Sequence, residues 1–225
     1  MLTFIITAGG IGKRMGGSVP KQFLLLNDKP ILMHTIEHMH AFDPTAQLIV
    51  TLPQDYLTDW DEMCQKYAFT IKHEIVSGGE ERFDSIKNAL EKATGDWIAV
   101  HDGVRPFITK SVLRQLLAEV RTHRAVIPVI PVKETLRIAD GETNATVSRD
   151  HYRIVQTPQI FEAKLLKKAY EQKYVTSFTD DASVVEAIGV RVHLIPGNDE
   201  NIKITNPLDL SVAAIILKNW TAKSG

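Results

Sequence analysis

Short apolar runs alternate along this chain with longer stretches in which apolar residues recur at helical spacing. The runs are rich in Val and Ile and in most cases end at Gly or Pro, as buried strands usually do. We predict strands at residues 4–7, 48–52, 98–101, 126–130 and 190–195. We predict helices over residues 56–67 and 112–120, after Pro30, after Arg82, after Asp180, and from Asn206-Pro207 onward. This alternation is typical of an α/β domain whose mostly parallel sheet has helices on both faces.

Residues 133–156 depart from this pattern. Thr135-Leu136-Arg137-Ile138 and Ala145-Thr146-Val147-Ser148 flank a polar turn at residues 140–144, which predicts a β-hairpin with little apolar surface. A two-stranded hairpin is only marginally stable by itself, so it should pack on its own domain or on a second subunit. We favour the second subunit, which makes this segment the dimerisation arm of a homodimer.

The composition is that of an ordinary globular domain. The 225 residues include 26 Lys and Arg against 27 Asp and Glu, and this balance argues against a dedicated nucleic-acid-binding protein, which would usually be basic. The only cysteine, Cys64, cannot form an internal disulfide, and its place in a helical repeat predicts a packing role. No apolar run approaches the roughly 18 residues of a membrane span, and no signal peptide is apparent. We expect a single domain over residues 1–225, cytoplasmic, with no membrane or nucleic-acid partner.

The first predicted strand leads into a glycine-rich loop that carries cations. The loop reads Ala8-Gly9-Gly10-Ile11-Gly12-Lys13-Arg14-Met15-Gly16-Gly17 and is followed by Pro20-Lys21-Gln22, and the first 27 residues contain no Asp or Glu. Glycines let the backbone approach a phosphate chain and point N–H groups at it, while cations neutralise its charge. The loop therefore predicts a phosphate site; a turn with solvated Lys and Arg is the alternative.

Two common nucleotide motifs do not match this loop. A Walker A loop needs Gly where Thr7 stands and Ser or Thr where Arg14 stands. A dinucleotide fingerprint that starts at Gly10 needs Gly or Ala where Met15 stands, and no acidic residue clearly ends the second strand. Hydride transfer is therefore disfavoured.

Two further loops offer ligand-binding groups. The glycine turn Gly78-Gly79 enters the helix that contains Ser85, where amides and a hydroxyl could read the edge of a base. Asp102 ends a predicted strand, which is where open α/β sheets hold ligands. It could take Mg²⁺ by one carboxylate, or it could equally be an N-cap or the ion-pair partner of Arg105.

Three other residues are candidates by position. Thr157 and Thr179 lie near predicted helix starts and are either ligands or caps. Lys203 lies between two Ile residues on a predicted short strand. Strand alternation turns Lys203 away from the side that the two Ile residues face, so a pocket location is plausible.

Two short motifs that match other enzyme families are weak evidence for those families. Residues 34–38, His-Thr-Ile-Glu-His, match the H-x-x-E-H pattern of a zinc peptidase, but no third ligand is apparent. Asp59-Trp60-Asp61 resembles the D-x-D of sugar-nucleotide glycosyltransferases, but it falls inside a predicted helix.

Five motifs in the same order and spacing carry a family resemblance over nearly the whole chain. They are Gly-x-Gly-x-Arg-Met (10–15) with Pro-Lys-Gln (20–22), Gly-Gly-x-x-Arg-x-x-Ser (78–85), His-Asp-x-x-Arg-Pro (101–106), Gln-Thr-Pro-Gln-x-Phe (156–161) and Asn-Ile-Lys-Ile-Thr (201–205). Together they resemble the 2-C-methyl-D-erythritol 4-phosphate cytidylyltransferase family of the non-mevalonate isoprenoid pathway. The resemblance implies a Rossmann-like nucleotidyltransferase fold with a projecting β-arm, a homodimer, and Mg²⁺-dependent transfer of CMP from CTP.

The resemblance also implies roles for individual residues. Arg14 and Lys21 would bind the triphosphate and stabilise the transition state, Arg149 and Lys203 would place the acceptor, and Asp102 would also be the metal ligand. The nucleotide-binding residues would be Ala8, Gly9, Gly10, Gly12, Gly79, Ser85, Asp102 and Gly103. The acceptor-binding residues would be Arg105, Thr135, Thr157 and Thr179, with Thr135 and Arg149 reaching in from the opposite subunit.

Two positions depart from the family pattern, and the acceptor stays open. Gly103-Val104 stands where the family often has two Ala, and Arg153-Ile154-Val155 stands where many members have Leu-Trp and a small residue.

A phosphate monoester already presents an ionised oxygen near neutral pH, so the reaction needs no general base. Methylerythritol phosphate is the favoured acceptor, ribitol 5-phosphate competes with it, and a module that binds CTP without turnover is the non-enzyme alternative.

Overall fold

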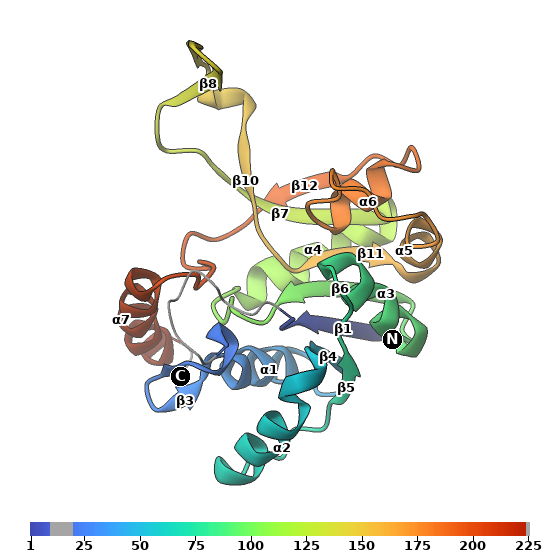
Figure 1. The fold of residues 1–225 in the computed structure, drawn as a ribbon, viewed down its shortest axis with the longest axis vertical. Helices are drawn as coiled ribbons and strands as arrows, with labels where there is room; N and C mark the ends of the chain where they lie inside the picture. The colour runs from blue at the N-terminus through green and yellow to red at the C-terminus, as the bar shows by residue number, and fades with distance from the viewer. Residues whose placement is uncertain (10–19, 224–225) are drawn as a thin grey trace.

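One mixed sheet organises the molecule. The computed structural model describes residues 1–9 and 20–223, and within them eight strands form a sheet in the order β10-β7-β11-β6-β1-β4-β5, with β12 paired to β7 (Figure 1). The strands are β1 (Leu2–Thr7), β4 (Gln47–Leu52), β5 (Glu74–Ser77), β6 (Trp97–Asp102), β7 (Ala125–Pro131), β10 (Arg153–Val155), β11 (Gln159–Glu162) and β12 (His193–Pro196). Strands β5, β4, β1 and β6 are parallel, and β10 and β11 run antiparallel to their neighbours. The predicted α/β class with a mostly parallel sheet is confirmed.

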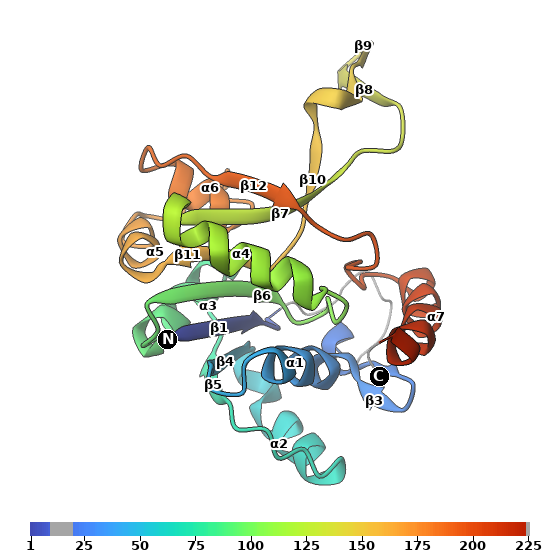
Figure 2. The same cartoon turned by 180° about the vertical axis from the view of Figure 1, so that it is seen from behind.

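Helices cover both faces of this sheet (Figures 1 and 2). Along β1, Phe4 and Ile6 join one buried cluster and Ile5 joins the other, because successive strand side chains point to opposite faces. The first face packs against α1 (Ile31–Phe42), α2 (Leu57–Lys66) and α4 (Lys110–His123); the second packs against α3 (Arg82–Lys92), α5 (Ala163–Ala169) and α6 (Asp181–Glu186). A third cluster joins α7 (Pro207–Lys223) to the region of β2 (Leu25–Leu26) and β3 (Lys29–Pro30). None of the helices described is long and apolar enough to cross a membrane.

The helix signals in the sequence are confirmed in their detail. Asn206 Oδ1 accepts a hydrogen bond from Asp209 N–H at 2.9 Å at the start of α7, and Asp180 caps α6 through Ser183 N–H at 2.9 Å. Cys64 is half-buried against the first core cluster. Burial raises the pKa of its thiol to about 11, so at neutral pH it is a packing group and no thiolate nucleophile.

Three local predictions are wrong. The strand predicted at residues 190–195 begins only at His193, where pairing with Val126 of β7 begins. Residues 201–205 form no strand; only Ile204 N–H bonds across, to Val104 O at 3.0 Å. Thr157 precedes β11 and not a helix. Strands β5, β10 and β11 and helix α5 were also missed, because each is short.

The hairpin predicted within residues 133–156 is present. Strands β8 (Leu136–Asp140) and β9 (Thr143–Val147) pair antiparallel, and Gly141 takes a φ of +57° in the tight turn. The hairpin stands away from the sheet at the top of Figures 1 and 2, and the chain returns through the 3₁₀ turn Arg149–His151 and β10. It pairs with no other strand of the described chain.

Candidate active site

A cavity of about 360 Å³ lies at the carboxyl ends of the parallel strands. Strands β1, β4 and β6 are neighbours in the sheet, so the loops that follow them converge there, as in other open α/β sheets. The described residues that line the cavity are Thr7, Ala8, Gly9, Lys21, Gln22, Thr51, Gly79, Glu80, Glu81, Arg82, Ser85, Asp102, Val104 and Lys203. The cavity thus gathers candidates from four of the five sequence motifs.

The loop after β1 is anchored at both ends of its described part. Ala8 N–H donates to Thr51 O at 3.0 Å, and Gln22 Nε2 donates to Ala8 O at 2.6 Å. These bonds hold Gly9 and Lys21 at the cavity wall. Gly10, Gly12 and Arg14, predicted to contact the nucleotide, lie outside the described residues.

The second glycine turn is shaped around Ser85. Gly79 N–H donates to Ser85 Oγ at 3.1 Å, and Ser85 Oγ donates to Glu81 O at 3.1 Å. A Cβ at Gly79 would overlap Asp84 Cβ, so only Gly fits there. The turn therefore has a structural reason for its glycine and its serine, and Ser85 Oγ keeps one lone pair for a ligand.

Asp102 is held between two cations at the end of β6. Its Oδ2 lies 2.9 Å from Arg105 Nε and 3.1 Å from Lys203 Nζ. Although burial opposes ionisation, Lys203 and Arg105 hold the pKa of this carboxyl well below its usual range. Asp102 is therefore ionised at neutral pH, and the ion pair with Arg105 that the sequence left open is present.

Lys203 reaches the cavity through its anchored neighbours. Asn201 is fully buried; its Nδ2 donates to Thr157 O at 2.8 Å, and its carbonyl accepts from Arg105 Nη1 at 2.8 Å. Ile204, which follows Lys203 in the chain, is also fully buried. The Lys203 side chain remains 41% exposed, so the alternation expected of a strand persists although no strand forms.

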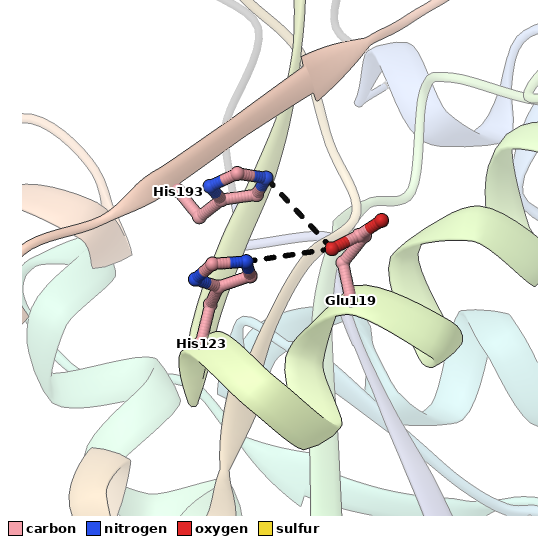
Figure 3. Close-up of side chains that lie close together, drawn as sticks. All are labelled: Glu119, His123 and His193. Carbon is pink, nitrogen blue, oxygen red and sulfur yellow. Dashed lines mark ion pairs between the residues drawn. The ribbon is translucent and has the colours of Figure 1, made fainter.

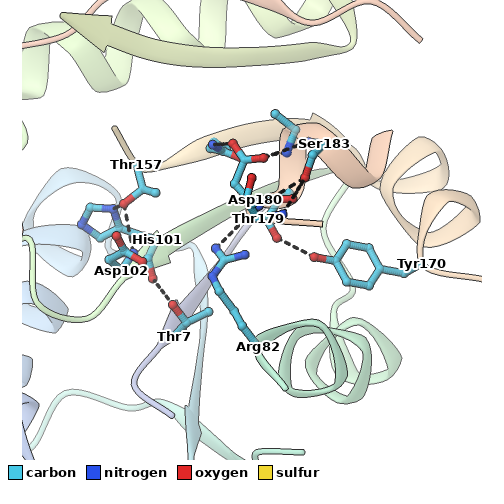
Figure 4. A network of polar contacts seen from close by, with 12 residues as sticks. Thr7, Arg82, His101, Asp102, Thr157, Tyr170, Thr179, Asp180 and Ser183 are labelled. Atoms are coloured by element: carbon cyan, nitrogen blue, oxygen red, sulfur yellow. Dashed lines mark hydrogen bonds and ion pairs between the residues drawn. The ribbon is translucent and has the colours of Figure 1, made fainter. Parts of the chain in front are cut away.

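Thr157 is buried beside Asp102 and is fully hydrogen-bonded (Figure 4). His101 Nε2 lies 2.9 Å from Arg105 O, which can only accept, so Nε2 carries the proton. Complete burial lowers the pKa of His101 to about 4, so the ring is neutral and its Nδ1 accepts from Thr157 Oγ1 at 2.9 Å. Thr157 Oγ1 in turn accepts from Asp102 N–H at 3.0 Å. The hydroxyl thus fixes the backbone of Asp102.

Arg82 lines the cavity, although no role was predicted for its side chain from the sequence. Its Nη2 lies 2.6 Å from Oδ2 of the fully buried Asp181, and Tyr170 Oη donates to Asp181 Oδ1 at 2.6 Å. Despite burial, Asp181 raises the pKa of the Arg82 guanidinium above its usual value. Its place in the Gly-Gly-x-x-Arg motif was the available signal. Arg82 ties α3 to α6 and adds a fixed positive charge to the cavity.

The remaining predicted residues lie elsewhere. Thr179 is exposed in a small hollow that shares Glu81 and Arg82 with the cavity. Gly103 packs: a Cβ there would lie 2.9 Å from Leu32 Cδ1 and 3.1 Å from Thr7 O. Thr135 and Arg149 are exposed on the arm, and Arg149 Nη1 donates to Lys133 O. A single chain therefore does not bring the arm residues to the cavity.

The residues present fit a magnesium ion that the nucleotide would largely hold. Mg²⁺ usually takes one or two protein carboxylates together with substrate phosphates. Asp102 supplies an ionised carboxylate, but two cations already face its Oδ2. We conclude that Asp102 can contribute one ligand and that phosphate oxygens must supply others.

The zinc-peptidase reading is excluded. His34 Nε2 is hydrogen-bonded to Leu26 O at 2.8 Å, and His38 Nε2 to Ile108 O at 2.5 Å. Glu37 pairs with Lys29 at 2.8 Å. The three side chains thus make separate contacts and do not face one ion.

The Asp59-Trp60-Asp61 motif lies inside α2, as predicted, and Trp60 is buried in the core.

Comparison with known proteins decides the family. The family model IspD, described as 2-C-methyl-D-erythritol 4-phosphate cytidylyltransferase, matches residues 2–219. The chain belongs to the IspD family. It is 51% identical over 216 residues to the enzyme of that name from Bacteroides fragilis, covering 96% of this chain and 99% of the relative. It is 38% identical over 222 residues to the Bacillus cereus enzyme of the same name, covering 97% of this chain and 98% of the relative.

Solved structures of IspD proteins share the fold. The Thermus thermophilus 2-C-methyl-D-erythritol 4-phosphate cytidylyltransferase has a TM-score of 0.79 at 29% identity, with 96% of this chain and 98% of that chain covered. The 4-diphosphocytidyl-2C-methyl-D-erythritol synthase of Anaerococcus prevotii has a TM-score of 0.81 at 26% identity, with 96% of both chains covered. The family resemblance carried by the five motifs is confirmed.

Proposed function

We propose that this IspD protein transfers CMP from CTP to 2-C-methyl-D-erythritol 4-phosphate in the cavity at the carboxyl ends of β1, β4 and β6, releasing pyrophosphate. The observation that carries the proposal is the convergence of Lys21, Arg82 and Lys203 on that cavity. The enzymes that it matches along their whole length carry the name of this reaction. A site that holds two phosphorylated reactants needs such a set of cations.

The reaction balances without a protein base. An oxygen of the acceptor phosphate attacks the α-phosphorus of CTP, a new P–O bond forms, and the bond to the bridging oxygen breaks as pyrophosphate leaves with its electron pair. The acceptor oxygen is already ionised, because the second pKa of a phosphate monoester is about 6. Catalysis is then mainly positioning and charge neutralisation.

The residues divide into two groups around the reacting phosphorus. Lys21, together with Arg14 of the same loop, would neutralise the triphosphate, and the Gly79–Ser85 turn would meet the cytosine edge. Lys203 would hold the acceptor phosphate, because its side chain is exposed to the cavity on a backbone that Asn201 anchors. Asp102 keeps Lys203 and Arg105 oriented, because both cations contact its Oδ2. Mg²⁺ would supply further charge neutralisation between the phosphates, with Asp102 as its protein ligand.

The arm completes the site in a homodimer under this proposal. It carries exposed apolar side chains, with Ile138 60%, Tyr152 45%, Ile154 44% and Val155 38% accessible. A second subunit would bury them, and Thr135 and Arg149 would then reach the acceptor in the partner's cavity. Cytoplasmic location stays a prediction.

A pyrophosphate-release assay tests the function. Purified protein with Mg²⁺ should release pyrophosphate with CTP and 2-C-methyl-D-erythritol 4-phosphate, and much more slowly with ribitol 5-phosphate or with ATP, GTP or UTP. Equal rates with ribitol 5-phosphate would overturn the acceptor assignment, and equal rates with ATP would overturn the cytosine assignment. Tight CTP binding without turnover with either acceptor would instead identify a CTP-binding module.

A further inference from the structure

Glu119, His123 and His193 converge at the end of the sheet where β7 and β12 begin. Glu119 and His123 lie four residues apart in the last turns of α4, so they share one face of that helix. His193 is the first residue of β12 and pairs in register with Val126, at the start of β7. The cavity lies instead at the carboxyl ends of β1, β4 and β6. This cluster therefore plays no direct part in the proposed transfer reaction.

The two imidazoles are held parallel with their Nε2 atoms toward one carboxylate oxygen (Figure 3). Their ring centroids are 3.7 Å apart and their planes differ by 2°. Glu119 Oε2 lies 3.5 Å from His123 Nε2 and 3.9 Å from His193 Nε2. Both separations exceed the 2.7–3.2 Å of an N–H···O hydrogen bond.

These separations suit a shared metal ion better than direct contact. Zn²⁺ binds His nitrogen and carboxylate oxygen at about 2.0–2.2 Å, so two ligand atoms of a tetrahedral site lie about 3.4 Å apart. The three ligand atoms all lie within 4.8 Å of one another. Because the two rings are stacked, their in-plane Nε2 lone pairs point side by side, so an imidazole must turn about its side-chain torsions for both nitrogens to face one ion.

The backbone pre-organises the three ligands. Ile195 lies two residues after His193 and is buried in the cluster that includes Leu116 and Val120 of α4. Strand alternation therefore turns His193 toward α4 as well. Arg124 ends α4 in the left-handed conformation, with φ 65°, and leads directly into β7. The ligands thus stand on rigid elements, and each remains more than a third exposed, open to an ion from solvent.

We propose that Glu119, His123 and His193 bind a divalent transition-metal ion of the Zn²⁺ class that fastens the edge strand β12 to α4. Two neutral imidazoles and one carboxylate are ligands that Zn²⁺ and Co²⁺ prefer, whereas Mg²⁺ and Ca²⁺ prefer oxygen ligands only. Three protein ligands leave the fourth tetrahedral position to water. Within the described residues, this is the one group of three or more His, Cys, Asp or Glu side chains whose ligand atoms lie close enough together to bind one ion.

Thermal unfolding and Co²⁺ spectroscopy test the site on the full chain without nucleotide. Zn²⁺ at about 100 times its Kd should raise the Tm by roughly 5–10 °C, and equal Mg²⁺ should not. Co²⁺ should develop the intense visible absorption of a four-coordinate ion. His193→Ala and Glu119→Gln should lose both effects. His40→Gln, which removes an imidazole from the end of α1, should keep both.

Each outcome decides the proposal. Comparing every variant with and without metal separates metal binding from any loss of stability that the substitution itself causes. An unchanged wild-type Tm with Zn²⁺, or a Co²⁺ spectrum that survives His193→Ala, would overturn it. Loss of the effects in His40→Gln as well would show that the bound metal lies elsewhere.

Discussion

Thr157 fixes Asp102 through the backbone: its Oγ1 accepts from Asp102 N–H at 3.0 Å while it donates to Nδ1 of the neutral His101. Asp102 is also the residue whose carboxylate holds Arg105 and Lys203. A buried hydroxyl that touches no reactant therefore helps to orient two cations of the site. Thr157 is best described as a positioning residue.

Thr157→Val keeps the shape of the side chain and removes the hydroxyl. The buried Asp102 N–H and His101 Nδ1 lose their partner, and we expect a loss of about 1–3 kcal/mol in the free energy of unfolding. The turnover number should also fall, because Asp102 is no longer fixed. Urea unfolding and steady-state kinetics measure the two effects. Thr157→Ser restores the hydroxyl and should recover most of both; if it behaves like Thr157→Val, the hydrogen bonds are not the cause.

Stability should decline in mild acid because His101 is buried in its neutral form. Its folded-state pKa is about 4 against an ordinary value of 6.5, so the unfolded chain takes up the proton first as the pH falls. The free energy of unfolding should drop by roughly 3 kcal/mol between pH 6.5 and pH 4 on this account. Burial lowers the pKa values of His34 and His38 as well, which adds loss in the same direction. Denaturant unfolding at a series of pH values measures the slope.

His101→Asn provides the control for that pH dependence. Asn gains no proton in this range, so the slope between pH 6.5 and pH 4 should become shallower while the shares of His34 and His38 remain. A slope that matches the wild type would assign the acid sensitivity to other groups.

Removing a cavity cation should slow turnover. Lys21→Ala and Lys203→Ala should each lower kcat by roughly 10²–10³-fold, which is the usual cost of removing one preorganised electrostatic group. Lys164→Ala removes an exposed charge from α5, away from the cavity, and should leave kcat unchanged. A kcat for Lys21→Ala within tenfold of the wild type contradicts its proposed role.

Mixed dimers test whether the arm acts on the partner's cavity. Arg149→Ala and Lys203→Ala chains should each be nearly inactive alone. In a dimer that contains one chain of each variant, one of the two cavities combines an intact Lys203 with an intact arm from the partner. About half of the dimers in an equal mixture are of this mixed kind, so the mixture should recover about a quarter of wild-type activity. If the arm served its own cavity, the mixture would stay as inactive as its parents.

Strands β1, β4, β6 and β7 and most helices could be predicted from the sequence because their signals are local. The apolar runs at β1, β4, β6 and β7 are continuous, and Asn206-Pro207 marks the start of α7 by capping chemistry alone. Strand β11 was missed because Gln159–Glu162 is four residues long and is held by pairing with β6 and β7. The predicted strand at Lys203 failed for the converse reason, since no strand among the residues that the structure describes pairs with it.

The role of Thr157 shows why the site was only partly readable. Its motif was visible, and a ligand or a cap were the two expectations. In the structure its hydroxyl instead joins His101 to Asp102, two residues that lie 56 and 55 positions away in the chain. No local pattern reports a bond that depends on β6 lying beside the start of β11.

The strand–helix alternation, the cationic glycine loop and the five motifs of the IspD family could be recognised in the chain, because they depend on residue type and spacing over short distances. The contacts of Lys203 with Asp102, of Arg82 with Asp181, and of His193 with Glu119 could not, because they form only in the folded chain. Each of these contacts joins segments that are far apart in the chain and meet only when the strands pair in register.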